Sequence, residues 1–359
     1  MKKTIVPFFI SHRGCPHRCI FCDQQKIAGA VGTFPSPAEI RDTVARYRHS
    51  SGSRVVDVAF YGGSFTSIAR EDQQRLLFPL QDLIAAGEVS SVRVSTRPDT
   101  LDAAAAAFLH AAGVDVVELG VQSMDDSVLR QAERGHAAAD VAPAVRCLKN
   151  EGITVGLQLM PGLPGDTMAI SLASLASVLE LRPDFLRIYP TVVVAGTPLA
   201  QRYADGSYRP LSLGEAVELC KRLLHCAHRA GVPIVRMGLQ PTVDLERGGV
   251  ILAGPFHPAF RQLVEGELCF DLLKKLLPRC TDGAEPVTVF CAPEKIADVV
   301  GQKRANIRRL HRDRGLRIGR VRGDSSLTPF EMIVAGSGGT RRGSILEDLS
   351  YTIKEKYHV

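Results

Sequence analysis

The fold is decided from the start by Thr4-Ile-Val-Pro-Phe-Phe-Ile10, a short apolar run that leads into Cys15-Pro-His-Arg-Cys19-Ile-Phe-Cys22. Such a run predicts a buried strand followed by a cysteine-rich loop. Similar runs recur along the chain, and patterns typical of helices separate them. The predicted strands are Thr4–Ile10, Val55–Tyr61, Ser91–Ser95, Val116–Gly120, Thr154–Leu159, Phe185–Tyr189 and Ile234–Met237. The predicted helices are Pro37–Tyr47, Arg70–Ala86, Leu101–Ala112, Asp125–Ala132, Ala139–Glu151, Thr167–Leu181 and Leu213–Ala230.

This alternation of strand and helix is typical of α/β proteins with a parallel sheet and helices packed outside it. The number of units favours a partial or complete (βα) barrel over a short open sheet. In such folds the functional residues gather beyond the carboxyl ends of the strands. We therefore expect the chemistry of this chain in the segments that directly follow its predicted strands.

The alternating pattern ends near residue 241, and the chain divides into three predicted regions. Residues 1–240 form the barrel. Residues 241–285 connect it to the rest, with a loop and then a long helix within Ala253–Leu277. Residues 286–359 form a small α+β domain. Its predicted elements are strand Val287–Cys291, helices Pro293–Val300 and Ala305–Arg314, strands Leu316–Val321 and Phe330–Ala335, and helix Ser344–Lys356.

Composition and charge narrow the class of protein. Of the 359 residues, 45% are hydrophobic and 23% charged, which is ordinary for a globular protein. The net charge is +6, and residues 286–359 alone contain 14 Lys and Arg against 8 Asp and Glu. The rest of the chain therefore balances to zero. A neutral body with a basic final region predicts a polyanionic partner for that region, although a merely soluble tail is the alternative.

The sequence also bears on location. No apolar stretch reaches the length of about 18 residues that a membrane helix needs, and Pro7 interrupts the short run near the start. We expect a cytoplasmic protein without a signal peptide or membrane contact. The nine cysteines are an odd number, which argues against a disulfide framework in this setting.

The cysteine triplet carries the strongest chemical signal. Cys15, Cys19 and Cys22 lie within eight residues, and thiolates so close together can hold one iron–sulfur or zinc centre. Three protein ligands on a four-iron cluster leave one iron open, which is the mark of a reactive site. The alternatives are a zinc site completed by His12 or His17, or three thiols without a metal.

Further polar and glycine residues follow successive predicted strands. Paired glycines allow a ligand close to the backbone. Arg97 can bind a carboxylate with two hydrogen bonds, or pair with Asp99 instead. Glutamine and arginine suit a ribose or a carboxylate. Each is ordinary by itself, but their joint placement predicts one ligand site. The candidates are Gly62, Gly63, Ser64, Ser95, Arg97, Gln122, Arg134 and Gln158.

The C-x-x-x-C-x-x-C motif, with Phe21 before its last cysteine, resembles the signature of the radical S-adenosylmethionine (SAM) superfamily. The resemblance implies a [4Fe–4S] cluster on Cys15, Cys19 and Cys22, whose open iron binds the amino and carboxylate groups of SAM. Reductive cleavage then yields methionine and a 5′-deoxyadenosyl radical, with an electron donor such as flavodoxin or ferredoxin. It also places Gly62–Ser64 at the methionyl amino group.

Within that superfamily, residues 4–240 resemble the radical domain of the Elongator catalytic-subunit family. The resemblance rests on Gly62-Gly-Ser-Phe65, Thr96-Arg-Pro-Asp99, Glu118-Leu-Gly-Val-Gln122, Arg134-Gly-His136, Met160-Pro-Gly-Leu-Pro-Gly165 and Arg182-Pro-Asp-Phe-Leu-Arg-Ile-Tyr-Pro190. Two departures stand out: the first cysteine gap is shorter, and the acetyltransferase domain is absent. The acyl-CoA chemistry of that family is therefore not carried over.

The final region resembles a type I KH domain. Val300-Gly-Gln-Lys-Arg-Ala-Asn-Ile307 lies between two predicted helices, where KH domains have a G-x-x-G clamp for nucleic acid. Gly301 fits this motif, but Arg304 replaces the second glycine. The resemblance and the density of basic residues predict RNA contacts, while a protein-docking module or a solvated basic helix is the alternative. The RNA-binding candidates are Lys303, Arg304, Arg308, Arg309 and Arg312.

Together these features predict a radical SAM enzyme that modifies RNA, with tRNA or rRNA as the substrate class. Two alternatives stay open. One is radical chemistry on a small molecule, as in oxygen-independent coproporphyrinogen oxidases. The other is an RNA-binding protein whose cluster is structural. Nucleic acid that copurifies with the protein would favour RNA modification over chemistry on a small molecule. Reductive cleavage of SAM would favour an enzyme over an RNA-binding protein with a structural cluster.

Overall fold

A computed structural model of the chain describes residues 4–10, 15, 17–23, 34–240, 249–277 and 285–351. The chain forms two compact units. The barrel unit comprises residues 1–211, 232–236 and 240–255, and the C-terminal unit comprises residues 212–231, 237–239 and 256–359. Helix α9 (Leu213–Arg229) thus belongs to the C-terminal unit, whereas the sequence analysis included its residues in the barrel region.

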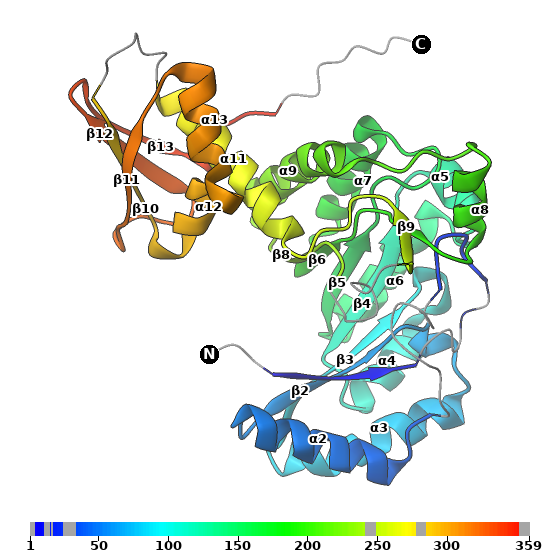
Figure 1. The fold of residues 1–359 in the computed structure, drawn as a ribbon. Helices are drawn as coiled ribbons and strands as arrows, with labels where there is room; N and C mark the ends of the chain where they lie inside the picture. Colours follow the sequence, from blue (N-terminus) through cyan, green and yellow to red (C-terminus); the bar gives the residue numbers. More distant parts are fainter. Residues whose placement is uncertain are drawn as a thin grey trace. The chain divides into compact units, whose positions relative to one another are not determined.

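The barrel unit contains a sheet of seven strands (Figure 1). They are β1 (Ile5–Phe9), β2 (Val56–Tyr61), β3 (Val89–Thr96), β4 (Val116–Gln122), β5 (Thr154–Leu159), β6 (Phe185–Ile188) and β8 (Ile234–Met237). The strands follow one another across the sheet in chain order, and those from β1 to β6 pair in parallel. All seven predicted strands are confirmed, and the sheet is a partial barrel with β1 and β8 at its edges among the described residues.

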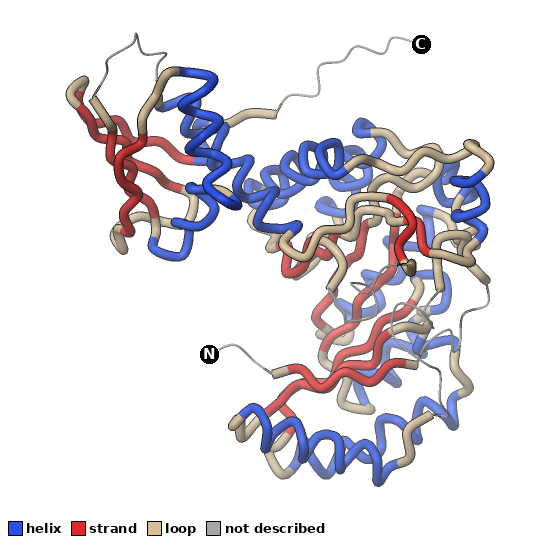
Figure 2. Tube along the Cα trace, in the orientation of Figure 1, coloured by secondary structure: helices blue, strands red, loops and turns tan. Residues whose placement is uncertain are grey.

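Helices alternate with the strands and pack outside the sheet (Figures 1 and 2). They are α2 (Pro37–Ser51), α3 (Arg70–Ala85), α4 (Ala103–Ala111), α5 (Asp126–Gln131), α6 (Val141–Asn150), α7 (Met168–Glu180) and α8 (Pro198–Ala204). Local chemistry sets where they begin: Ser36 and Glu39 form a capping box at α2, and Thr167 caps α7. The sequence analysis missed α8 and the small ladder of β7 (Val193–Val194) with β9 (Ile251–Ala253).

The two faces of the barrel sheet differ in chemistry. Side chains such as Val58, Phe60 and Val94 are fully buried on the face toward the helices. The other face is polar. There the guanidinium of Arg187 on β6 donates a hydrogen bond to the hydroxyl of Tyr61 on β2 at 3.4 Å, although three strands lie between them. The sheet is therefore curled, and its concave face carries the polar side chains.

The C-terminal unit is built from α9, α11 (Phe260–Leu276) and a second sheet. That sheet comprises β10 (Val287–Cys291), β11 (Ile318–Gly323), β12 (Glu331–Gly336) and β13 (Gly339–Ser344), in the order β11-β10-β12-β13. Strand β10 is parallel to β11 and antiparallel to β12. Helices α12 (Ile296–Val300) and α13 (Ala305–Arg314) connect β10 to β11, and α14 (Ile345–Asp348) follows β13.

The predicted helix Ser344–Lys356 is confirmed at its start, where Ser344 caps α14, but α14 ends at Asp348 and residues 349–351 are not helical. The strand before it was not predicted. Residues Gly339–Ser344 form strand β13, which pairs with β12 through a tight turn at Gly336–Gly339. The strand escaped detection because it has glycine or polar residues at every position, so it lacks the apolar alternation of a half-buried strand. Residues 352–356 lie outside the described residues. The strand–helix–helix–strand order is present, but the added strand leaves the KH resemblance a prediction.

Candidate metal centre and cofactor site

The cysteine loop is held by its own apolar residues. Ile20 is fully buried and Phe21 nearly so, in a cluster that α5 and α8 also line. The backbone N–H of Ile20 donates to the carbonyl of Ala132 at 3.2 Å, and its carbonyl accepts from the N–H of Leu199 at 2.9 Å. The loop thus sits in a fixed place because its hydrophobic residues are part of the core. Cys19 is buried, whereas Cys15 and Cys22 are half-buried.

Arg134 connects the cysteine loop to the sheet. One guanidinium nitrogen lies 3.4 Å from the sulfur of Cys19, and another donates to the carbonyl of Gly120 on β4 at 2.8 Å. The side chain is buried, and its Nε has no hydrogen-bond partner among the described residues. No carboxylate among the described residues pairs with it. A buried cation without an anionic partner is costly, so this position favours an anionic ligand.

Arg97 positions Arg134. Its side chain is only 2% exposed, and it donates to the carbonyl of Arg134 at 2.6 Å. The same guanidinium binds both carboxylate oxygens of Asp99 at 2.9 Å. The pairing with Asp99 that the sequence left open is therefore present, in a buried rather than a surface setting. Burial alone would raise the pKa of Asp99, but Arg97 outweighs it and holds that pKa below its usual range.

The predicted residues after β2 and β3 meet one another. Ser64 is fully buried, and its hydroxyl lies 3.1 Å from that of Thr96, at the end of β3. Burial raises the pKa of the Cys15 thiol, while Arg134, Arg97 and a backbone hydrogen bond from Ser64 oppose that rise. These interactions bring Cys15 close to Ser64 and to both arginines. Gly62 and Gly63 directly precede Ser64, and Ser95 lies beside Glu118 on β4.

Two glutamines meet on neighbouring strands. The amide nitrogen of Gln158 on β5 donates to the side-chain oxygen of Gln122 on β4 at 3.2 Å. Gln122 has a φ of 69°, a left-handed conformation, at an irregularity in the pairing of β4 with β5. Such strain in a non-glycine residue is typical of functional sites. A side chain at Gly120 would place its Cβ 2.7 Å from Gln122 Nε2 and 2.8 Å from Arg134, so it would displace the ends of these two polar side chains.

Gly135 and His136, which follow α5, lie close to the cysteine loop and to Arg134, although the sequence predicted no role for them. Gly135 has a φ of 77°, and a Cβ there would lie 2.2 Å from the ring of His17 in the cysteine loop. His136 is buried, and neither ring nitrogen has a hydrogen-bond partner among the described residues. Burial, with Arg134 and Arg97 nearby, lowers the pKa of His136 to about 3. Its imidazole is therefore neutral at physiological pH.

A charged cluster fills the concave face below these residues. Glu118 is buried and accepts from Arg93 at 2.7 Å and from Arg187 at 2.8 Å. Arg187 also donates to the hydroxyl of Tyr189 at 3.0 Å. Two guanidiniums against one carboxylate leave this part of the barrel interior with a net positive charge. Arg187 belongs to the 182–190 stretch that resembles the Elongator family, whereas no sequence signal marked Arg93. Their contact through Glu118 depends on strand register and on the curl of the sheet.

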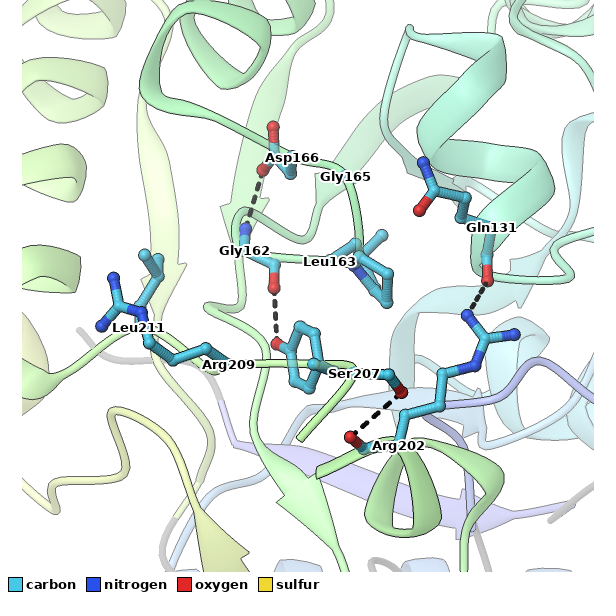
Figure 3. A pocket seen from close by; sticks show the side chains of 11 residues that line it. Gln131, Gly162, Leu163, Gly165, Asp166, Arg202, Ser207, Arg209 and Leu211 are labelled. Carbon is cyan, nitrogen blue, oxygen red and sulfur yellow. Dashed lines mark hydrogen bonds between the residues drawn. The ribbon is translucent and has the colours of Figure 1, made fainter. Parts of the chain in front are cut away.

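A cavity of about 450 Å³ lies beside the loop that follows β5 (Figure 3). The hydroxyl of Tyr208 donates to the carbonyl of Gly162 at 2.6 Å, and an oxygen of Asp166 accepts from the N–H of Gly162 at 2.7 Å. Arg202 lines the cavity and donates to the carbonyl of Gln131 at 3.1 Å. None of the predicted cofactor residues lines this cavity. It is a feature that the sequence analysis did not foresee.

Whether the cysteine loop can hold a metal centre depends on which donor side chains lie together. Among the described residues, no three His, Cys, Asp or Glu side chains are grouped so that they could hold one metal ion. That finding covers Cys15, Cys19 and Cys22 as well as His17, so it does not decide between the cluster and zinc, and His12 lies outside the described residues. The surroundings of the thiols nevertheless fit an anionic cluster. Arg134 is a buried guanidinium whose side-chain partners among the described residues are a thiol and a carbonyl, which suits added negative charge at the cysteines.

The basic candidates of the C-terminal unit differ in their contacts. Arg309 binds the carboxylate of Glu267 with two nitrogens, and its guanidinium carbon lies 3.8 Å from the centre of the Phe270 ring. Arg312 is exposed and pairs with its neighbour Asp313 at 2.8 Å. Lys303, Arg304 and Arg308 are exposed and make no ion pair among the described residues. Arg304 has a φ of 62°, the left-handed conformation that glycine adopts at less cost.

The sheet is a curled, parallel partial barrel, with a cysteine loop and buried polar residues at the ends of its strands. This arrangement is typical of enzymes with a (βα) barrel fold. The comparisons name the family. The model for the radical SAM superfamily matches residues 9–172, and the model for the radical SAM C-terminal domain matches residues 183–269. The chain belongs to the radical SAM superfamily, a family of enzymes that use a [4Fe–4S] cluster and SAM.

Similar proteins point in one direction. The chain is 30% identical over 236 residues to a tRNA uridine(34) acetyltransferase of Dehalococcoides mccartyi, covering 56% of this chain and 51% of that protein. It is 27% identical over 259 residues to human Elongator complex protein 3, covering 59% of this chain and 47% of that protein. The chain therefore spans about half the length of these curated relatives.

A solved structure agrees on the fold. The archaeal Elp3 of Methanocaldococcus infernus, with an N-terminal deletion, superposes with a TM-score of 0.59 at 22% identity. The match covers 77% of this chain and 64% of that one. The predicted resemblance to the Elongator catalytic-subunit family and the predicted barrel type are confirmed. The described part of the chain contains no helix long and apolar enough to cross a membrane.

Proposed function

We propose that this chain is a radical SAM enzyme that modifies tRNA. The observation that carries the proposal is the convergence of Cys19, Arg134 and Gly120 at the ends of the barrel strands. The names of the relatives, which act on tRNA uridine 34 or belong to Elongator, support tRNA as the substrate class. An enzyme acting on tRNA would work in the cytoplasm.

Cys15, Cys19 and Cys22 would hold the cluster through their thiolates. When bound, the cluster and SAM supply a radical that abstracts hydrogen from the substrate. An electron donor such as flavodoxin or ferredoxin would provide the reducing electron. The rest of the work falls to this chain's own residues, which bind and orient the cofactor and exclude water.

Each predicted cofactor residue has a distinct physical role in this proposal. Arg134 holds positive charge against Cys19, while Arg97 fixes its backbone. Gln122 and Gln158 present amides on the concave face, where they can hydrogen-bond a ribose or a carboxylate. Gly62, Gly63, Ser64 and Ser95 supply backbone and hydroxyl groups at the ends of β2 and β3. His136 stays neutral in this site and adds no charge.

The C-terminal unit would hold the RNA. Lys303, Arg304 and Arg308 are exposed and without ion pairs among the described residues, so phosphates could reach them without breaking an internal contact. Arg312 is exposed and makes only a surface ion pair, whereas Arg309 has internal partners. Because of these partners we expect the weakest RNA contact at Arg309, and the Arg309→Ala variant serves as the control for the exposed residues.

The test has two parts. Anaerobically reconstituted protein should bind about four irons per chain, as one four-iron cluster requires, and should form 5′-deoxyadenosine from SAM under a strong reductant. Nucleosides of tRNA from cells with and without the gene should then differ by mass spectrometry. Full zinc occupancy without iron would contradict the radical chemistry, and identical nucleosides would contradict the tRNA substrate.

A further inference from the structure

The four-stranded sheet of the C-terminal unit has one covered face and one open face. Val289, Cys291 and Val334 are buried on the face against which α11 and α12 pack. The alternate residues of the same strands point the other way, because successive side chains of a strand lie on opposite faces. Phe290 and Ile333 on this outer face are only half-buried. The helices lie to one side of this sheet in Figure 2.

The strand register lines up four residues across the outer face. Arg322 on β11 pairs with Phe290 on β10, Phe290 pairs with Ile333 on β12, and Ile333 pairs with Arg342 on β13. Neighbouring strands lie about 4.8 Å apart, so the row forms one continuous surface. Arg320 lies two residues before Arg322 and belongs to the same face. The row therefore combines a partly exposed aromatic ring with arginines beside it.

The charges of this surface are not neutralised from within. Arg342 pairs with Glu331 at 2.6 Å, but Arg320 and Arg322 are exposed and make no ion pair among the described residues. Protection of an edge strand explains charge on β11, since β11 ends the sheet. It does not explain why the central strand presents Phe290 beside those charges. Aromatic rings with arginines on an open sheet face are suited to stack bases and to bind phosphates.

We propose that this outer face binds single-stranded RNA, with a base stacked on Phe290 and phosphates on Arg320 and Arg322. The inference rests on the proposed RNA-modifying function and adds a second contact surface to it. The first surface consists of Lys303, Arg304 and Arg308, at the start of α13 and in the turn before it, and α12 packs on the opposite face of the sheet. RNA bound to both surfaces would have to pass around one edge of the sheet, and β11 is the edge that carries the free arginines.

The chain offers an optical test, because it contains no tryptophan. A Phe290→Trp variant of the full chain has a single reporter on the outer face, and base stacking quenches indole fluorescence. Titration with a mixed-sequence single-stranded RNA about 12 nucleotides long, within the site size of one such binding surface, should give saturable quenching. A Phe78→Trp variant is the control, since Phe78 is 70% exposed on α3 of the barrel unit. Its fluorescence should stay unchanged over the same titration.

A second variant tests the charges separately. The double change Arg320→Gln and Arg322→Gln should weaken RNA binding about tenfold and lower the slope of log affinity against log salt by about 1.4, or about 0.7 for each lost phosphate contact on a single strand. The control changes Arg41 and Arg75 of the barrel unit to Gln, since both are exposed. That control removes the same charge and should leave the slope unaltered.

The outcomes separate this inference from the proposed function. Suppose that the unaltered chain binds both tRNA and the short RNA, but the fluorescence of the Phe290→Trp variant and the salt slope of the double variant do not change. The outer face is then not an RNA surface, this inference is overturned, and the proposed function stands. If the unaltered chain binds neither RNA, the RNA substrate itself is contradicted and this inference falls with it.

Discussion

The two units differ in how far their arginine side chains are buried. In the barrel unit, Arg97 and Arg134 are 2% and 8% exposed, and backbone carbonyls hold both in place. In the C-terminal unit, Arg308, Arg320 and Arg322 are exposed and without internal partners among the described residues. A buried charged side chain has a fixed orientation, and its electrostatic interactions are stronger than in water. Both properties suit the binding of a small ligand in one geometry. Exposure leaves a charge hydrated and screened by salt, which suits reversible binding to a polyanion.

The largest expected effect comes from the cysteine loop. Cys19→Ala should abolish both the iron–sulfur absorption and the formation of 5′-deoxyadenosine, because two thiolates cannot retain the cluster. Iron analysis and product chromatography after anaerobic reconstitution measure this. Cys147→Ala is the control, since Cys147 lies on α6, away from the loop in sequence, and should leave both signals intact. Equal iron in the two variants would disprove the assignment of the ligands.

Arg134→Ala should weaken SAM binding by about 100-fold. The reason is that a hydrogen bond to a charged group contributes about 1.5–3 kcal/mol. Iron content should remain, because the three thiolates are untouched. Equilibrium binding of SAM to the reconstituted protein provides the measurement. Arg134→Lys keeps the charge but cannot reach Cys19 and Gly120 together, so it should recover only part of the affinity. Loss of iron in Arg134→Ala would make the role of this residue structural instead.

The basic patch at the start of α13 and in the turn before it should show a smaller effect that depends on salt. Changing Lys303, Arg304 and Arg308 together to Ala should weaken tRNA binding and reduce the salt slope by about 2–3, nearly one for each lost contact on duplex regions. Cleavage of SAM without RNA should not change. Arg309→Ala is the matched control: it removes the internal partner of Glu267, so it should lower stability more than the salt slope. A slope unchanged in the triple variant would rule out this patch.

Gly135→Ala should destabilise the cysteine loop by about 1–3 kcal/mol, the cost of a strained backbone conformation. The position has a φ of 77°, and the new Cβ would meet the ring of His17. Faster loss of iron during dialysis is the expected readout. Gly52→Ala has a similar φ of 63° but open space around it at the end of α2, so it is the control for a strained alanine that does not touch the loop. Equal iron loss in the two variants would mean that neither the strain nor the collision at Gly135 loosens the loop.

The smallest effect concerns acid stability of the C-terminal unit. Burial alone would raise the pKa of Asp271, but hydrogen bonds from Lys221, Lys274 and Tyr351 hold it below 3.8. A carboxyl whose pKa is lower when folded stabilises the fold above its unfolded pKa and loses that effect as pH falls. Asp271→Asn should therefore lower stability at pH 7 by about 1–3 kcal/mol. The difference should shrink between about pH 5 and pH 2.

The urea midpoint of this unit, followed through the indole fluorescence of a Phe290→Trp background, measures that difference at each pH. Asp313→Asn serves for comparison, because Asp313 is exposed and its one ion-pair partner among the described residues is Arg312. It should shift the midpoint little at any pH. A difference between Asp271→Asn and the unaltered residue that stays constant down to about pH 2 would contradict the lowered pKa.

Local sequence patterns predicted much of the fold. Strands such as Thr154–Leu159 and Ile234–Met237 were predicted to the residue, because each is a short and mostly apolar run between two helical patterns. The cysteine loop was equally clear, since three metal ligands in eight residues need no tertiary information. Strand β13 was missed because its residues carry no such signature, and pairing with β12 alone makes it a strand.

Within the site, the sequence by itself determined which residues follow the strands, because that order is a property of the chain. Only the tertiary structure decided which of them meet. Arg97 binds Asp99 and the carbonyl of Arg134, Arg187 reaches Tyr61 across the curled sheet, and Arg309 takes Glu267 as its partner. These contacts join residues 2 to 126 positions apart in sequence. Their distances depend on sheet curvature and helix packing, which no local periodicity encodes.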